Sequence, residues 1–266
     1  MKGAIASFLL GISLIAGSGV AYGEGCLSCN DSDEPASSCS AKDKVKAEPE
    51  SVRAKQTTEM VKTVLDSLPA ADAKTRYTTL TETDFKRVAN RLGVEVAAIK
   101  AVVVIEAGEK MEGFWAPGVP VVNFDNSMYS RFRNKVKSPK GNPSEKVPSG
   151  LSGYALKEWT QLVNARKSNV DGANMGTFWG MFQIGGFNYK QCGCESVAEM
   201  VKLMSYSELE QLELFATFII NSGMVDDLKK KNWAAFAKKY NGPSYAKRGY
   251  HTKMANAYAR FKKNNK

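Results

Sequence analysis

Apolar positions recur at helical spacing along most of the chain beyond about residue 80. The first such segment follows Thr81-x-x-Asp84, an approximate helix-capping signal, and ends at a glycine. Its apolar face consists of Phe85, Val88, Ala89 and Leu92. The same spacing predicts further helices at about 154–167, 196–203, 207–221, 233–240 and 250–262.

The segment 94–108 carries an acidic residue in line with its apolar side chains. Val96, Ile99, Val103 and Glu106 follow at spacings of three, four and three, so they share one helix face. A carboxyl placed there is partly removed from water, which raises its pKa above about 4.3. A glutamic acid that stays protonated near neutral pH can protonate a leaving oxygen, as glycoside hydrolysis requires. The alternative is a frayed last turn in which Glu106 points into water.

Residues 113–124 interrupt the helical pattern with Gly and Pro, and 119–124 predict a short strand that runs into Asp125. Residues 131–153 are basic and rich in Pro, Gly and Ser, which indicates an exposed loop. No internal repeat is visible. The sequence therefore predicts a mainly α fold, a helical domain with a small β excursion beside the helix that carries Glu106.

The N-terminus is typical of a signal peptide. Lys2 precedes a charge-free run over 3–23, and the closing Ala-Tyr-Gly offers small residues for cleavage after Gly23. A retained membrane anchor is disfavoured because the run is short and weakly apolar. We therefore expect export, to the periplasm or outside the cell. The expected organisation is a signal peptide at 1–23, a leader at 24–75 with a short amphipathic helix at 52–68, and a main domain at 76–266.

The formal net charge of +10 indicates a polyanionic partner, which could be nucleic acid, anionic lipid or a bacterial cell-wall polymer. No Arg-rich run or RNA-binding aromatic signature accompanies the charge, so nucleic acid is not favoured. The single histidine, His251, leaves a Cys/His metal site short of ligands and argues against a Ser-His-Asp or Cys-His hydrolase. An odd number of cysteines leaves at least one unpaired or paired between molecules: Cys26, Cys29, Cys39, Cys192 and Cys194.

Two further segments, 177–184 and 233–245, combine aromatic and amide side chains, which suits a glycan groove. Taken singly, each is typical of a buried core and a helix C-cap. Their order after the helix-terminal Glu106 resembles the lysozyme-like superfamily of goose-type lysozymes and lytic transglycosylases. The resemblance is closer to the N-acetylmuramidase family of phage endolysins and covers about residues 80–262.

Four motifs carry this resemblance in register. The first two are Leu-Thr-Glu-x-Asp-Phe at 80–85 and a helix with Val-x-x-Ala-Ile-Lys-Ala-Val and then Glu at 94–106. The third is Trp-Gly-x-Phe-Gln-Ile-x-Gly-Phe-Asn at 179–188. The fourth is Trp-Ala-x-Phe-Ala-x-x-Tyr-Asn-Gly-Pro-x-Tyr at 233–245.

The resemblance implies an α+β lysozyme-like muramidase without a cofactor or metal, acting as a monomer on peptidoglycan glycan strands, with no nucleic-acid partner and no stable membrane anchor. It would cleave the β-1,4 bond between N-acetylmuramic acid and N-acetylglucosamine. Glu106 would be the general acid, and Asp125 would orient a water or stabilise the oxocarbenium-like transition state. The residues implied to bind substrate are Gln183, Tyr240, Asn241, Trp179 and Tyr154.

Two positions depart from the family pattern. Ala107 stands where Ser usually follows the catalytic Glu, and Asp125 stands where Glu usually follows Phe. The shorter side chain leaves the role of Asp125 open. Two other functions also stay open: a lytic transglycosylase that uses Glu106 alone as acid and then base, and a catalytically silent wall-binding protein.

Overall fold

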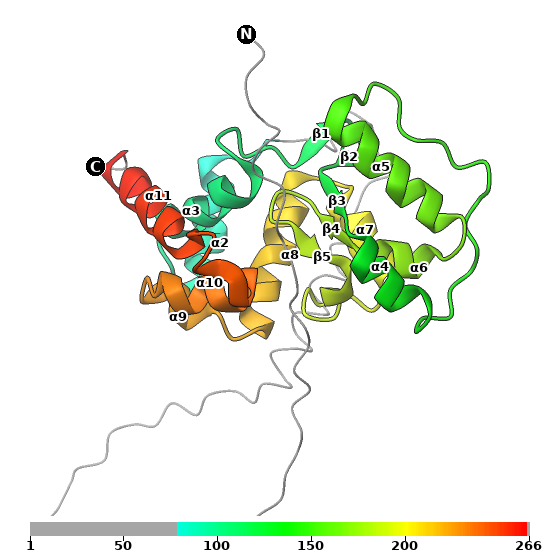
Figure 1. The fold of residues 1–266 in the computed structure, drawn as a ribbon. Helices are drawn as coiled ribbons and strands as arrows, with labels where there is room; N and C mark the ends of the chain where they lie inside the picture. Colours follow the sequence, from blue (N-terminus) through cyan, green and yellow to red (C-terminus); the bar gives the residue numbers. More distant parts are fainter. Residues whose placement is uncertain (1–78, 265–266) are drawn as a thin grey trace, which may run out of the picture.

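The computed structural model describes residues 79–264, which form ten α-helices and two small antiparallel sheets (Figure 1). The predicted mainly α fold with a small β part is therefore confirmed. The predicted signal peptide, the predicted helix at 52–68 and the first three cysteines lie outside the described residues. Within 79–264, no helix is both long and apolar enough to cross a membrane.

The helix α2 (Glu82–Leu92) begins as its sequence predicts. Thr81 accepts a hydrogen bond from the Asp84 backbone N–H, and the Asp84 carboxylate accepts one from the Thr81 backbone N–H, so the capping box is complete. The helix ends at Gly93 with φ at +62°, a conformation that glycine adopts without steric cost. The predicted face of Phe85, Val88, Ala89 and Leu92 is buried.

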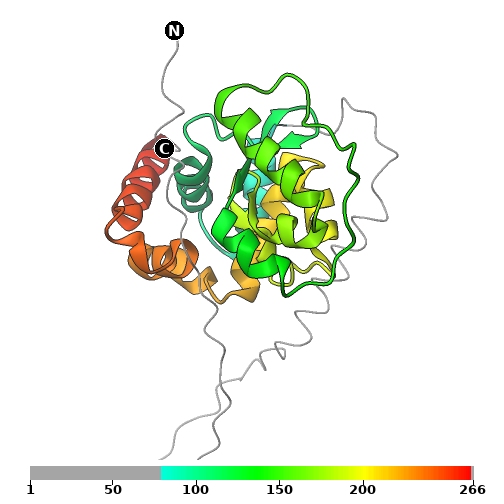
Figure 2. The same cartoon turned by 45° about the vertical axis from the view of Figure 1, so that its right-hand side comes forward.

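The helix α3 (Val96–Ala107) is buried on nearly all sides, not only on the face that the sequence predicts. Its small Ala and Val side chains let neighbouring helices approach closely, and α11 (Tyr250–Asn264) packs along its length (Figure 2). Lys100 is also buried, where it pairs with Glu82 and lies 5.2 Å from the centre of the Phe85 ring. Because α3 is held from several sides, Glu106 in its last turn has a fixed place.

Two small sheets follow α3. The strands β1 (Phe114–Ala116) and β2 (Val119–Pro120) form an antiparallel pair. The strands β3 (Val122–Phe124), β4 (Thr177–Trp179) and β5 (Ile184–Gly185) form a second sheet in that order, with Asn123 opposite Phe178. The prediction of one strand over 119–124 is wrong in detail, because Val121 separates two strands that belong to different sheets.

The other helices surround this sheet and α3, with α8 between the two sides of the molecule (Figure 1). The predicted helices are confirmed within a few residues: α5 (Gly153–Arg166), α7 (Val197–Met204), α8 (Glu208–Asn221), α10 (Trp233–Asn241) and α11. The sequence did not predict three short helices and two 3-10 turns: α4 (Asn126–Arg133), α6 (Val170–Met175), α9 (Val225–Lys229), η1 (Gly186–Asn188) and η2 (Pro243–Tyr245). Cys192 and Cys194 are buried free thiols.

Candidate active site

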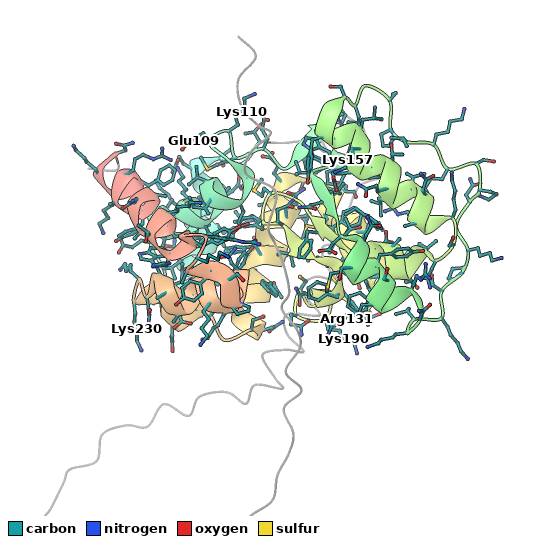
Figure 3. The ribbon with its side chains drawn as sticks, viewed as in Figure 1. Glu109, Lys110, Arg131, Lys157, Lys190 and Lys230 are labelled. Carbon is teal, nitrogen blue, oxygen red and sulfur yellow. The ribbon has the colours of Figure 1, made fainter. Side chains whose placement is uncertain are left out.

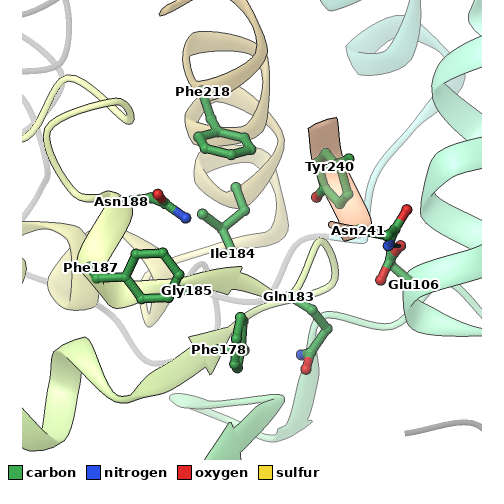
Figure 4. A pocket seen from close by; sticks show the side chains of 10 residues that line it. All are labelled: Glu106, Phe178, Gln183, Ile184, Gly185, Phe187, Asn188, Phe218, Tyr240 and Asn241. Carbon is green, nitrogen blue, oxygen red and sulfur yellow. Dashed lines mark hydrogen bonds between the residues drawn. The ribbon is translucent and has the colours of Figure 1, made fainter. Parts of the chain in front are cut away.

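A pocket lies at the C-terminal end of α3 (Figure 4). Its empty space, with the open solvent at the mouth included, is about 410 Å³. Its walls come from α3, the β4–β5 hairpin, η1, α8 and the end of α10. It is therefore formed by segments that lie up to 135 residues apart in the sequence. The lining residues are Glu106, Phe178, Gln183, Ile184, Gly185, Phe187, Asn188, Phe218, Tyr240 and Asn241.

Glu106 is the only carboxyl among these lining residues. Its side chain is turned into the protein, and only 8% of the residue is exposed, so the prediction of a helix-terminal Glu106 removed from water is confirmed. Burial raises the pKa of Glu106 from 4.5 to about 7, although a hydrogen bond from Asn241 acts in the opposite direction. Glu106 can therefore hold a proton near neutral pH and release it to a group in the pocket.

The C-terminal end of α10 supplies the neighbours of Glu106. Asn241 Nδ2 donates to Glu106 Oε1 at 2.8 Å, and the two side chains point toward one another (Figure 4). Tyr240 donates its hydroxyl to the Phe182 carbonyl at 2.6 Å, which ties α10 to the β4–β5 hairpin across the pocket. Gly242 ends the helix with φ at +78°, so the Tyr-Asn-Gly motif is both a helix end and a pocket wall.

Gln183 enters the pocket from the turn between β4 and β5. Its φ is +47°, a conformation that is uncommon outside glycine and asparagine and is often found at functional sites. Gln183 Nε2 donates to the Gly180 carbonyl at 2.8 Å. Gln183 Oε1 and Asn241 Oδ1 are both buried and accept no hydrogen bond from any described residue. Buried acceptors without a donor are costly, so these two oxygens mark places where a ligand can bind.

The sequence did not identify Gln211, which holds this turn from behind. Gln211 is fully buried on α8, and its Oε1 accepts a hydrogen bond from the Met181 N–H at 2.8 Å. Its Nε2 donates to the carbonyls of Gly113, at 3.2 Å, and Met204, at 2.8 Å. A Cβ added at Gly180 would lie 2.7 Å from the Gln211 amide. Glycine at that position and an amide at 211 therefore fit each other and fix the turn that carries Gln183.

Three predicted site residues lie elsewhere. Trp179 has no exposed surface, its Nε1 donates to the Asn174 carbonyl at 3.0 Å, and it is not among the residues that line the pocket. Tyr154 lies outside the pocket, edge-on to Trp115 with ring centres 6.1 Å apart. Asp125 is not among the lining residues either. Its Oδ1 caps α4 by accepting from the backbone N–H groups of Ser127, at 2.8 Å, and Met128, at 3.0 Å.

Other pocket residues were missed by the sequence prediction. Phe178 alternates with Trp179 along β4, so the two rings lie on opposite faces of the sheet and only Phe178 reaches the pocket. Phe187 and Asn188 belong to the motif at 179–188, but neither side chain has a chemical property that would by itself indicate a binding site. Tyr250 is also close to Glu106, since burial and then the charge of that carboxyl raise its pKa to about 12. Within residues 79–264, no cluster of three His, Cys, Asp or Glu side chains could hold a metal ion.

Comparisons with known proteins identify the family of the chain. Residues 95–262 match the family described as Muramidase: N-acetylmuramidase. Among solved structures, the crystal structure of Burkholderia AP3 phage endolysin is 35% identical, with a TM-score of 0.58 over 72% of this chain and 73% of that chain. A search of curated proteins gave no match. Since the family match covers more than half of the sequence, the chain belongs to the N-acetylmuramidase family of glycoside hydrolases.

Proposed function

We propose that the protein hydrolyses the β-1,4 bond between N-acetylmuramic acid and N-acetylglucosamine in peptidoglycan, with Glu106 as the general acid. The observation that carries this proposal is the buried Glu106 in the pocket, with its pKa raised to about 7. A carboxyl with that pKa is largely protonated in mildly acidic solution and about half protonated at pH 7, and the leaving oxygen becomes a stronger base as it gains negative charge, so it takes the proton as the bond breaks.

The proposed reaction begins when Glu106 donates its proton to the bridging oxygen. The bond between that oxygen and C1 of the sugar breaks through an oxocarbenium-like transition state. A water adds its oxygen to C1, and Glu106 regains a proton before the next turnover. The products are two shorter strands, one of which carries a new reducing end.

The pocket offers partners for both the polar and the apolar parts of a sugar. Gln183 Oε1 and Asn241 Oδ1 are buried acceptors that suit a hydroxyl or the N–H of an acetamido group. Phe178 and Phe187 line the opposite wall, where an aromatic ring can pack against the C–H face of a sugar. The Tyr240 hydroxyl already donates to the Phe182 carbonyl, so the role of Tyr240 is mainly to hold α10 against the β4–β5 hairpin.

A second candidate is a lytic transglycosylase, and one observation favours it. Glu106 is the only carboxyl that lines the pocket, and a transglycosylase needs no other, because the muramyl 6-hydroxyl replaces water. In the proposed hydrolase, a catalytic role for Asp125 stays a prediction. Its hydrogen bonds to the N-terminus of α4 account for one of its two oxygens.

We further infer that the protein is exported to the periplasm or beyond the cell, acts as a monomer and meets the wall there. This inference rests on the signal-peptide pattern of residues 1–23 and on the net charge of +10, which suits an anionic wall.

The two chemical candidates are separated by weighing their products. Purified sacculi digested by the protein should release fragments with reducing ends if water is the acceptor. Fragments with 1,6-anhydro ends are lighter by one water and would assign the protein as a transglycosylase. Release of neither kind of fragment by a folded protein would contradict both.

A further inference from the structure

One side of the pocket continues into a row of exposed positive charges. These side chains come from the end of α4, the segment after it and the turn after η1, and we call them the basic strip: Arg131, Arg133, Lys135, Lys137, Lys140 and Lys190. None of the six forms an ion pair with an acidic residue of the described chain. Unpaired cations of one sign attract anions to the surface that carries them.

Nearby acidic groups do little to neutralise the basic strip. Glu145 pairs with Arg166 at 2.9 Å, on the inner side of the loop. Asp125, at the other end of α4, is held by the backbone N–H groups of that helix. Asp171 is the remaining acid beside the segment, where its backbone N–H donates to Ser138 Oγ at 2.9 Å. The strip is therefore a net positive surface.

The backbone beneath these cations is fixed by hydrogen bonds. Asn169 Nδ2 donates to the carbonyls of Arg133, at 2.9 Å, and Val136, at 3.1 Å. The Val170 N–H donates to the Pro139 carbonyl at 3.3 Å. Although sequence composition predicts a plain exposed loop here, its path is held against the start of α6. The backbone positions that carry these charges are consequently fixed, which reduces the backbone entropy lost when a ligand binds.

An aromatic contact joins the basic strip to the pocket. Phe132, which lies between two of the arginines, stacks on Phe187 with ring centres 5.7 Å apart and an angle of 20°. Phe187 lines the pocket together with Asn188, and Lys190 follows two residues later. Arg131 and Lys190 accordingly lie on the same side of the molecule, whereas Lys230 is on the other side (Figure 3). A glycan strand bound in the pocket would therefore pass the basic strip at the edge of the pocket.

We propose that the basic strip binds the carboxylates of the peptides attached to the glycan strand, an inference that rests on the proposed muramidase function. In peptidoglycan both sugars are uncharged where the lactyl group is amide-linked, so the negative charge near a bound strand lies on its stem peptides. A peptide of about five residues reaches up to roughly 17 Å, at about 3.3–3.6 Å per residue, so its carboxylates can lie well beyond the pocket that holds the sugars. Arg and Lys are the usual partners of such carboxylates.

A membrane surface fits the basic strip less well. Helices and loops that lie on a membrane combine basic residues with exposed apolar side chains. Phe132 and Val136 are only partly exposed, and the one large hydrophobic residue that is well exposed among the described residues is Leu156, on α5. The basic strip is thus charged but lacks the exposed apolar side chains that would insert into a membrane.

The test compares one triple variant on two substrates. Arg131→Gln, Lys135→Gln and Lys137→Gln are combined, and the matched control combines Lys86→Gln, Lys230→Gln and Lys263→Gln, three exposed lysines that form no ion pair with a described acid. The substrates are Gram-negative sacculi, which lack phosphate-rich wall polymers, and glycan strands stripped of peptides by an amidase. All variants should keep their Tm, since each change is on the surface.

We expect the strip variant to lose about tenfold in kcat/KM on sacculi, a size typical of removing electrostatic attraction, and less than twofold on stripped strands. The control should lose less than twofold on both. An equal loss on both substrates, or a loss no larger than that of the control, would overturn the proposal. So would a variant that digests sacculi normally but no longer binds phosphatidylglycerol vesicles, because the strip would then serve a membrane. A wild-type protein that cleaves neither substrate would refute the muramidase function itself.

Discussion

Replacing Glu106 with glutamine should change the stability of the protein by an amount that depends on pH, and the change should favour the variant more as pH rises. The pKa of Glu106 is raised from 4.5 to about 7 in the folded state, so between these pH values the folded protein binds more protons than the unfolded chain. Its free energy of unfolding therefore falls as pH rises through this window. The penalty is absent below pH 4.5, where both states are protonated, and complete above about 7, where both are charged. Glutamine is never charged and avoids it.

The size of the effect follows from the same pKa. At about 1.4 kcal/mol per pKa unit, a pKa raised from 4.5 to about 7 corresponds to about 3 kcal/mol. The extra amide hydrogens of Glu106→Gln need a partner, and if Asn241 Oδ1 does not accept one, the cost is about 1–3 kcal/mol at every pH. The constant cost cancels when the change in unfolding free energy caused by Glu106→Gln is compared between two pH values. The difference between the two pH values is therefore the quantity to measure.

The assay is thermal or urea unfolding of wild type and Glu106→Gln at pH 4 and at pH 8.5. The Tm of the variant relative to wild type should rise by roughly 6–12 °C between the two pH values, at about 2–4 °C per kcal/mol for a protein of this size. A relative Tm that does not change with pH would mean that the pKa of Glu106 is the same in the folded protein as in the unfolded chain. The explanation of its acid role by burial would then be refuted.

Three other substitutions test the surroundings of Glu106. Asn241→Ala removes the hydrogen bond that lowers the pKa of Glu106, so the alkaline limb of the pH profile of kcat/KM should move upward from about 7; a downward shift would contradict the assigned contact. Gln211→Met leaves the buried Met181 N–H and two carbonyls without their partners, so it should lower the free energy of unfolding in urea by about 2–4 kcal/mol. A loss under about 1 kcal/mol would show that the turn keeps its conformation without Gln211. Asp125→Asn keeps a good helix cap and should keep its Tm, while Asp125→Ala should lose about 1 kcal/mol of stability. If Asp125 acts in hydrolysis, Asp125→Asn should lose most of its rate at unchanged Tm, whereas unchanged activity would remove Asp125 from the mechanism.

The sequence predicted the helices well because their signals are local. The capping box at Thr81 and the apolar spacing around Glu106 both act within a few residues, and both are present in the structure. The sequence predicted one strand over 119–124 but missed β1, β4, β5 and the break at Val121, because each strand contains two or three residues and β3 pairs with β4 about 55 residues later in the chain. Pairing over that distance leaves no periodic pattern to detect.

The residues of the pocket that belong to local sequence motifs were predicted, and those that depend on distant segments were not. Glu106, Gln183, Tyr240 and Asn241 were found through motifs, and they meet in one pocket. Trp179 was assigned to substrate through the resemblance, in a segment whose aromatic and amide side chains suit a glycan groove, but alternation along β4 points its side chain into the core. The support from Gln211 could not be predicted, because its importance depends on backbone groups from three distant segments.

The most direct measurement of the central claim is the rate of sacculus digestion by Glu106→Gln beside Glu210→Gln. Glu210 is a suitable control because burial also raises its pKa to about 7, with Glu213 adding to the effect, but it lies on α8 outside the pocket. Glu106→Gln should lose at least about 10²–10⁴ in rate, since general acid catalysis contributes that much, while Glu210→Gln should stay near wild type. Retention of more than about a tenth of the wild-type rate by a folded Glu106→Gln would contradict its role as the general acid.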